Sequence, residues 1–257
     1  MAYDATATRI FSIPPYTFFA VIGVVFASSL FILLLLKYGY NIPRYTKIFF
    51  ISGIGILIGA KFFGLITGLY AALANKEPIT IDTLLNTGIV FYGGLIGFLL
   101  SFLFICKIWN KNIEYRVVDL VVVCIPLFHF WGRLGCFFGG CCYGKETQSP
   151  FSVLYTNRIS NEIITKSRIS IQLFEAGINI VIFIFLLKLL NMGKFKEHLM
   201  KVYLSTYAIL RIILELFRGD SVRGVWHGVS FSHVVSIFIL MICFILFFTS
   251  KEKVYEC

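Results

Sequence analysis

Charged residues are scarce in this sequence. Lys, Arg, Asp and Glu together occupy 14% of the 257 positions, whereas apolar residues occupy 58%. Soluble domains usually carry about 25% charged residues. The composition therefore excludes an ordinary soluble enzyme and indicates an integral membrane protein.

Two further absences narrow the class. The net charge of +10 is not gathered into one basic patch or stripe, which is the pattern of a nucleic-acid-binding protein. Basic residues are instead spread over the connections between apolar runs, so we expect no nucleic-acid partner. The first 15 residues lack a basic region followed by a short apolar core, so we expect no cleavable signal peptide there.

Long apolar runs are what the chain has in abundance. A helix that crosses the hydrocarbon core of a bilayer needs about 20 mostly apolar residues. Seven such runs predict an all-α integral membrane protein, a single domain over residues 1–257 with seven transmembrane helices. The runs cover roughly residues 18–36, 48–74, 88–106, 117–131, 172–190, 200–217 and 233–249.

The basic residues also predict an orientation. Connections on the cytoplasmic side of a membrane protein are enriched in Lys and Arg. The connections after the first, third and fifth runs and the C-terminal tail share this enrichment, whereas residues 75–87 carry one lysine against two acidic residues. We therefore predict an N-terminus outside and a C-terminus in the cytoplasm. The long connection at about 132–171 would then lie at the outer face.

Residues 132–144 are the least lipid-like stretch of the chain. This stretch combines Arg133 with five glycines and three cysteines. Glycines let the backbone approach a ligand closely, and the planar guanidinium group of arginine can bind a phosphate through two hydrogen bonds. The alternative is a tight turn in which Arg133 extends toward lipid headgroups.

Several other polar residues interrupt the apolar runs. A charge within a membrane span is costly and usually faces protein, water or a partner. Lys61 lies in the middle of the second run, and Arg211, Glu215 and Arg218 form a charged ladder at spacings of four and three residues. These charges are candidate site residues, with headgroup contact by Lys61 as its alternative.

Uncharged candidates lie near the same ends of the runs. Tyr92 precedes Gly93 and Gly94, whose backbone N–H groups could meet an anion, although paired glycines are also common in helix packing. If the fourth helix continues past residue 131, His129 and Arg133 share one face. A histidine there has either a structural or a catalytic role.

Cysteines occur at seven positions, three of them in the stretch 132–144. Cys136, Cys141 and Cys142 follow a C-x4-C-C spacing, which is not a standard zinc pattern and has no histidines at the usual distances. We therefore favour a disulfide or free thiols over a metal site, and expect a disulfide between the neighbours Cys141 and Cys142 to be strained. No metal or cofactor is expected.

Taken together, these stretches resemble the phosphatidylglycerol–prolipoprotein diacylglyceryl transferase family over most of the chain. The resemblance rests on separated motifs with matching order and spacing. They are Tyr16, Gly59-Ala60-Lys61-Phe62, Phe91-Tyr92-Gly93-Gly94-Leu95-Ile96-Gly97, Asp119, Pro126, Gly132-Arg133-Leu134-Gly135, Gly144, Gln172-Leu173-Phe174-Glu175, and Tyr207 with Arg211, Glu215 and Arg218. The chain departs from the family pattern where Lys61 replaces an arginine, Tyr92 a histidine, Cys136 an asparagine and Cys141 a glutamate.

The resemblance implies a function in lipoprotein biosynthesis at the bacterial cytoplasmic membrane, with a multi-pass chain and an active site toward the outer face. The reaction is transfer of diacylglyceryl from phosphatidylglycerol to the cysteine thiol of a prolipoprotein signal peptide. Phosphatidylglycerol, the signal peptide and membrane lipids are thus the expected partners. Two alternatives remain open, a related transferase with another acceptor, in which Cys136 or Cys141 could be the nucleophile, and an inactive lipid- or lipopeptide-binding protein.

Within this resemblance each candidate receives an expected role. Arg133 and Arg218 would hold the phosphate of the donor. The base that forms the thiolate would be His129 or Tyr92, unless the positive field of the arginines is sufficient. The expected substrate-binding residues are Tyr16, Lys61, Gly93, Gly94, Cys136, Cys141, Gly144, Tyr207, Arg211 and Glu215.

Overall fold

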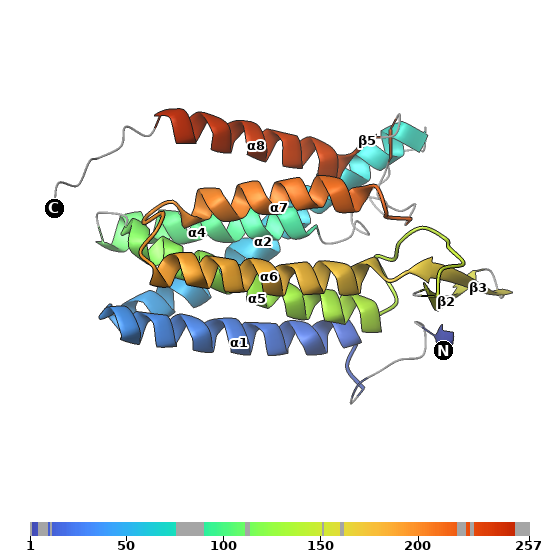
Figure 1. Ribbon diagram of the computed structural model, residues 1–257, viewed down its shortest axis with the longest axis horizontal. Coiled ribbons are helices and arrows are strands. Elements are labelled where there is room, and N and C mark those ends of the chain that lie inside the picture. Colours follow the sequence, from blue (N-terminus) through green and yellow to red (C-terminus); the bar gives the residue numbers. More distant parts are fainter. Residues whose placement is uncertain are drawn as a thin grey trace.

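A bundle of roughly parallel and antiparallel helices forms the body of the protein (Figure 1). The computed structural model describes residues 2–4, 10, 12–75, 90–110, 114–150, 152–159, 162–219, 225–226 and 229–249. Within these ranges the helices are α1 (Pro15–Tyr38), α2 (Ile42–Asn75), α4 (Phe91–Asn110), α5 (Tyr115–Phe138), α6 (Ile171–Asn191), α7 (Leu199–Glu215) and α8 (Phe231–Thr249).

The helical class predicted from the apolar runs is confirmed. Each of the seven runs coincides with one of these helices, and α1, α2, α4, α5 and α6 are long and apolar enough to cross a membrane. The helix α7 spans 17 residues and carries Arg211 and Glu215, whereas the apolar part of α8 covers Phe231–Phe247.

The central helix α5 is longer than its apolar run predicts. The run ends near residue 131, but the helix continues to Phe138 through Gly132 and Gly135. A side chain at Gly135 would lie 3.1 Å from the Tyr16 Cα of α1, so this glycine permits close packing of two helices and does not end one. Since the helix continues, Arg133 and Cys136 belong to its last turns.

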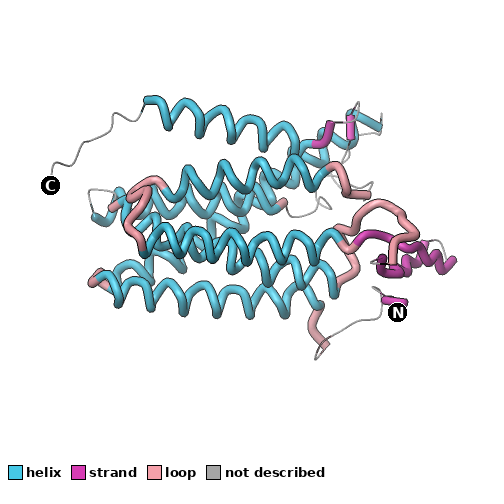
Figure 2. Tube along the Cα trace, in the orientation of Figure 1, coloured by secondary structure: helices cyan, strands magenta, loops and turns pink. Residues whose placement is uncertain are grey.

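The connection after α5 folds into a small sheet. Strands β2 (Ser152–Ile159) and β3 (Glu162–Ile169) form an antiparallel hairpin in which Ser152 is paired with Ile169. Strand β1 (Ala2–Asp4) lies parallel to β2 at its other edge. We call this end of the molecule the hairpin end, and Figure 2 shows its strands in magenta beyond the ends of the helices. The short strands β4 (Val225–Trp226) and β5 (Val229–Ser230) pair antiparallel before α8.

Polar contacts between helix ends close the opposite end of the bundle. The buried carboxylate of Asp119 on α5 accepts hydrogen bonds from the backbone N–H groups of Glu197 and Leu199, at 2.6 and 3.0 Å. The bond from Leu199 satisfies an N–H group that the first turn of α7 leaves without a helical partner. Lys37 at the end of α1 donates to Asn191 at the end of α6 at 2.8 Å. The acidic connection at 76–87 and the C-terminal basic tail, both used to predict orientation, lie outside the described residues.

Candidate active site

Three arginine side chains meet on one buried carboxylate at the hairpin end. The carboxylate belongs to Glu175 on α6, which is 3% exposed. Its Oε1 receives the Arg211 Nη1 at 2.8 Å and the Arg218 Nη1 at 3.2 Å, and its Oε2 contacts the Arg133 Nε. An unpaired carboxylate would be costly at this depth, and three unpaired guanidinium groups would repel one another.

A second carboxylate completes this arginine cluster, defined as Arg133, Arg211, Arg218, Glu175 and Glu215. Glu215 Oε2 lies 2.9 Å from Arg211 Nη2, one helical turn along α7 as the charged ladder predicts. Three positive and two negative groups leave a formal charge of +1 (3 − 2). The cluster can therefore accept an additional anion, and its guanidinium groups have the geometry to bind a phosphate.

Arg133 is oriented by the preceding turn of α5. Its Nε donates to the His129 Nε2 at 3.1 Å, which confirms that the two residues share one helix face. The His129 ring stacks on Phe91 at a centroid distance of 3.7 Å and lies 5.2 Å from the ring of Tyr207. Because Nε2 accepts a hydrogen bond from a guanidinium, His129 is neutral in this arrangement.

Arg218 is positioned by the backbone that follows α7. Gly144 and Arg218 form an isolated β-bridge, and the Lys145 N–H donates to the Phe217 carbonyl at 2.9 Å. A side chain at Gly144 would lie 2.8 Å from the Ile169 Cβ and 3.0 Å from the Phe217 carbonyl. Gly144 thus brings three chain segments together and holds Arg218 at the cluster. The contacts of Gly144 are thus structural, and a contact between Gly144 and the substrate stays a prediction.

Of the tyrosines predicted for the site, Tyr16 and Tyr207 lie beside Arg133. Tyr92 is buried, and its hydroxyl forms a 2.6 Å hydrogen bond with Ser236 of α8. The Tyr92 ring packs edge-on against Tyr207 at 5.5 Å, so it belongs to the aromatic layer beside the cluster.

Gly93 and Gly94 have a different setting from the one predicted. Both are buried against α2, where a side chain at Gly93 would meet the Gly59 carbonyl oxygen at 2.2 Å. The Gly94 N–H already donates to the Val90 carbonyl at 3.2 Å. The structure thus uses the paired glycines for packing between α2 and α4, and their contact with an anion stays a prediction. Lys61 lies half-buried on the same stretch of α2.

Three thiols gather where α5 ends. The sulfur atoms of Cys136, Cys141 and Cys142 all lie within 4.8 Å of one another, and none forms a disulfide. The turn that brings them together contains Gly140 at φ 63° and Cys142 at φ 61°. This backbone conformation costs a non-glycine residue about 1–2 kcal/mol.

The thiols interact with one another and with the arginines. Hydrogen bonds donated by the Cys136 and Cys141 thiols hold the pKa of the Cys142 thiol well below its usual value. The positive charges of Arg218 and Arg133 act in the same direction. The thiol group therefore belongs to the same electrostatic site as the arginine cluster.

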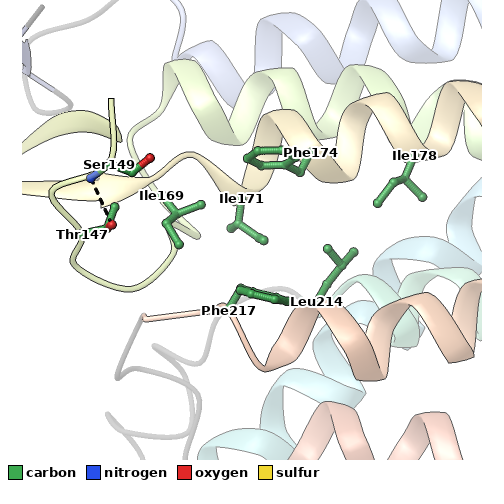
Figure 3. Close-up of a pocket in the computed structure, with 8 residues that line it drawn as sticks. All are labelled: Thr147, Ser149, Ile169, Ile171, Phe174, Ile178, Leu214 and Phe217. Carbon is green, nitrogen blue, oxygen red and sulfur yellow. Dashed lines mark hydrogen bonds between the residues drawn. The ribbon is translucent and has the colours of Figure 1, made fainter. Parts of the chain in front are cut away.

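An apolar groove opens between α6 and α7 next to the cluster. It has a volume of about 330 Å³, with Ile171, Phe174 and Ile178 on one side and Leu214 and Phe217 on the other (Figure 3). Ile169, Thr147 and Ser149 line its hairpin end. Phe174 and Phe217, which line the groove, directly adjoin Glu175 and Arg218 in the sequence, so the groove lies close to the cluster.

Two residues that organise the site were named in a family motif by the sequence analysis, which gave neither of them a role. Glu175 is the centre of the arginine cluster, and Gln172 donates to the Cys141 carbonyl at 2.6 Å while accepting from the Tyr155 hydroxyl at 3.2 Å. Their spacing of three residues near the start of an otherwise apolar helix places both on one helix face, which is the signal that could have assigned them to the site.

Comparisons with known proteins place the chain in a family. The family described as prolipoprotein diacylglyceryl transferase matches residues 5–249. A phosphatidylglycerol–prolipoprotein diacylglyceryl transferase of Clostridium tetani is 31% identical over 214 residues, which cover 82% of each chain. A second enzyme of that name from Clostridium perfringens is 30% identical over 241 residues, covering 93% of this chain and 91% of the relative. A protein of the same name from Acinetobacter baumannii is 22% identical over 225 residues, 85% of this chain and 81% of the relative. With its helical bundle, its buried arginine cluster and this match over nearly its whole length, the chain belongs to the prolipoprotein diacylglyceryl transferase family.

Proposed function

We propose that this protein transfers the diacylglyceryl group of phosphatidylglycerol to the cysteine thiol of a prolipoprotein signal peptide. The product is a thioether, and glycerol phosphate leaves. Family membership supports the reaction class, because the relatives are named for this donor and acceptor. The observation that carries the proposal to this chain is the arginine cluster, which is buried, has a formal charge of +1 and lies beside an apolar groove.

Arg133 and Arg218 bind the donor phosphate in this proposal. Both side chains reach the same carboxylate from different elements, so both can contact one phosphate that lies beside it. Negative charge develops on the phosphate as the carbon–oxygen bond breaks, and positioned cations stabilise that charge. Arg211 remains paired with Glu215 and Ser232, and keeps Glu175 in place.

The apolar groove holds an acyl chain of the donor. Its walls are aliphatic and aromatic side chains from α6 and α7, and it ends at residues adjacent to Glu175 and Arg218. An acyl chain there would place the headgroup beside the cluster. Tyr16 would line the headgroup pocket because it lies beside Arg133, and Tyr207 would close the pocket from the aromatic layer.

A topology follows from the ends of the bundle. Lys37, Arg116 and Lys188 lie at the end opposite the hairpin, where Arg116 also donates to the Leu190 carbonyl at 3.2 Å. The positive-inside rule makes this end cytoplasmic. We infer seven membrane spans in the bacterial cytoplasmic membrane, with the N-terminus and the arginine cluster toward the outer face. Alkaline phosphatase fused to the C-terminus should be inactive, and green fluorescent protein there should fluoresce. The opposite result would reverse the topology.

Transfer of labelled diacylglyceryl to a signal peptide that contains the acceptor cysteine tests the function. Replacing Arg133 or Arg218 by alanine should lower the rate by roughly 10²–10³-fold, the usual effect of losing one transition-state donor. Lysine should rescue only in part because it cannot bond bidentately. Arg44→Ala is the matched control, since Arg44 is exposed at the other end of the bundle. Full activity in both alanine variants would refute the phosphate role. Lipid binding by the unaltered protein without transfer would favour a lipid-binding protein.

A further inference from the structure

The thiol cluster of Cys136, Cys141 and Cys142 has the composition of a metal site. Its three sulfur atoms lie within 4.8 Å of one another. Zinc binds thiolates at about 2.3 Å, so sulfur atoms around a tetrahedral zinc are about 3.8 Å apart. Small rotations of the three side chains would bring the sulfurs to that separation. Thiolates select soft or borderline ions such as zinc over magnesium or calcium.

The backbone explains why the sequence spacing does not predict this site. Cys136 lies in the last turns of α5, and the chain then reverses through Gly140 and Cys142, both at positive φ. The Cys141 N–H donates to the Cys136 carbonyl at 3.1 Å, and Gln172 holds the Cys141 carbonyl. This reversal places neighbouring cysteines beside a helical one. Cys142 supplies a thiol at a position where glycine would be unstrained.

The cluster provides three ligands and leaves the fourth position open. Among the residues that the structure describes, no histidine, aspartate, glutamate or further cysteine joins the three sulfurs at metal-ligand spacing. Zinc sites closed by four protein ligands are structural, whereas sites with three protein ligands and one open position are catalytic. One zinc ion with three thiolates carries a charge of −1 (2 − 3), and the nearby Arg133 and Arg218 compensate that charge.

We propose that Cys136, Cys141 and Cys142 bind one zinc ion whose fourth position takes the acceptor thiol of the signal peptide. The role of the zinc rests on the transferase function proposed above. It replaces the expectation, drawn from sequence spacing alone, that these cysteines bind no metal. Zinc also supplies a way to form the acceptor thiolate without a base, since the His129 Nε2 is bonded to Arg133 and the Tyr92 hydroxyl to Ser236.

The chemical step balances without any other reactant. On binding zinc the acceptor thiol releases its proton to water, since a coordinated thiol is deprotonated. The sulfur then donates an electron pair to the glyceryl carbon that bears the phosphate. The carbon–oxygen bond breaks and its electron pair leaves with glycerol phosphate, which Arg133 and Arg218 stabilise. The thioether product has lost its negative charge and dissociates from zinc. Cys136 lies three residues after Arg133 on one helix face, so nucleophile and leaving group can be held side by side.

Cobalt binding tests the metal site independently of activity. The full-length protein, reduced, stripped of metal and kept without oxygen in detergent, is titrated with Co²⁺ and then Zn²⁺. We expect one equivalent of Co²⁺ with thiolate-to-cobalt charge-transfer absorption that Zn²⁺ removes. Cys142→Ser and Cys136→Ser should weaken Co²⁺ binding by more than about 100-fold. Loss of a residue that only hydrogen-bonds to a metal ligand lowers affinity by about 10–100-fold, and loss of the ligand itself should cost more. Cys106→Ala is the control, since Cys106 is buried in the apolar core.

The variant Cys142→Gly distinguishes loss of the metal site from loss of the fold. Glycine tolerates the positive φ at position 142, so this variant should be at least as stable as the unaltered protein and still fail to bind Co²⁺ tightly. Unchanged Co²⁺ affinity in Cys142→Gly would overturn the proposal. So would a disulfide between any two of the three cysteines in protein purified without oxygen.

The acceptor role has its own measurement. A signal peptide with its cysteine should raise the charge-transfer absorption of the cobalt protein by about one third, as three thiolates become four. The same peptide with serine should leave the spectrum unchanged. Zinc removal should abolish diacylglyceryl transfer, and added Zn²⁺ should restore it. Full transfer by the metal-free enzyme and by Cys142→Ser would overturn the zinc role while the transferase function stands. A peptide-dependent spectrum without transfer from phosphatidylglycerol would support the thiol site and refute the donor assignment.

Discussion

At the scale of single residues, the carboxylate of Glu175 allows three guanidinium groups to lie together in one buried site. Its two oxygens contact Arg133, Arg211 and Arg218, and the carboxylate is almost fully buried. Removing one partner of such a buried ion pair typically costs about 3–5 kcal/mol, because the remaining charges lose their compensation. The donor phosphate would bind beside this carboxylate, on the guanidinium groups of Arg133 and Arg218.

The variant Glu175→Gln should therefore be less stable, and it should be rescued by an anion. We expect a lower Tm in detergent, with a loss of roughly 3–5 kcal/mol in the free energy of unfolding. Phosphatidylglycerol should raise the Tm of this variant more than that of the unaltered protein, because its phosphate replaces the missing charge. Glu146→Gln is the control, since Glu146 pairs with Lys166 and Arg168 at the exposed surface, where such pairs contribute little. An equal Tm shift with lipid in all three proteins would contradict the phosphate site.

The hydrogen bond between His129 and Arg133 fits two roles of His129, a base or a residue that positions Arg133. Its Nε2 accepts from the Arg133 Nε, so the structure favours a positioning role for His129 over a base. Glutamine can also accept a hydrogen bond, so His129→Gln should keep most of the activity and the same pH profile between about pH 6 and 7. His129→Leu removes the acceptor and should lower kcat. Loss of an ionisation near this pH range in His129→Gln would instead identify His129 as the base, which is one of the alternatives that the sequence left open.

At the scale of elements, the contact between α2 and α4 depends on glycines that face each other. Side chains placed at Gly59 and Gly93 would each lie 2.2 Å from the backbone oxygen of the other, and a side chain at Gly97 would lie 2.1 Å from the Gly55 oxygen. Both helices thus approach at backbone contact, as small residues allow in membranes.

A single methyl group at this contact should force the helices apart. We expect Gly93→Ala to lower stability by about 1–3 kcal/mol, the usual cost of overpacking. Gly53→Ala is the matched control, because a side chain there meets nothing within 4 Å and alanine is the better helix former. Thermal unfolding in detergent compares the two. A larger loss in Gly53→Ala than in Gly93→Ala would contradict the packing role.

The helices and strands also show which features of the fold the sequence could predict and why the other features required the structure. Apolar runs predicted each helix in the described part of the chain, because a helix that crosses the hydrocarbon core needs such a run whatever its neighbours are. The end of α5 was placed seven residues too early (138 − 131), since Gly132 and Gly135 suggested a turn, whereas both are helical and Gly135 packs against α1. The hairpin formed by β2 and β3 lies in a polar connection that the sequence predicted only as an outer-face loop.

The candidate site was predictable to a similar degree. Arg133 and Arg218 were placed together because both follow the same ends of apolar runs, and the structure brings both to Glu175. Glu175 itself was not selected, since its importance depends on three partners distant in sequence. The three cysteines were named from the sequence, but their geometry was not predictable. Their sulfur atoms come together because the chain reverses at Gly140 and Cys142.

At the scale of the whole molecule, the arginine cluster, the thiols and the apolar groove all lie toward the hairpin end. The opposite end carries Lys37, Arg116 and Lys188 and the contacts of Asp119 that hold α5 and α7 together. An enzyme that joins a lipid to a peptide must admit the lipid from the side, because acyl chains do not leave the bilayer. The groove between α6 and α7 is the described feature that fits this requirement (Figure 3).

Narrowing this groove should therefore impair use of the lipid donor without removing the catalytic groups. Ile178 lines the groove on α6, and its replacement by tryptophan fills part of a volume of about 330 Å³. A steric cost of about 1–3 kcal/mol corresponds to roughly a 5–150-fold rise in KM for phosphatidylglycerol. Short-chain phosphatidylglycerol should be affected less than long-chain donor, and KM for the acceptor peptide should not change. Ile58→Trp is the control, because Ile58 is 66% exposed on α2. If Ile178→Trp raised KM equally for donors of every chain length, the groove would not hold an acyl chain, and the lipid would have to enter between other helices.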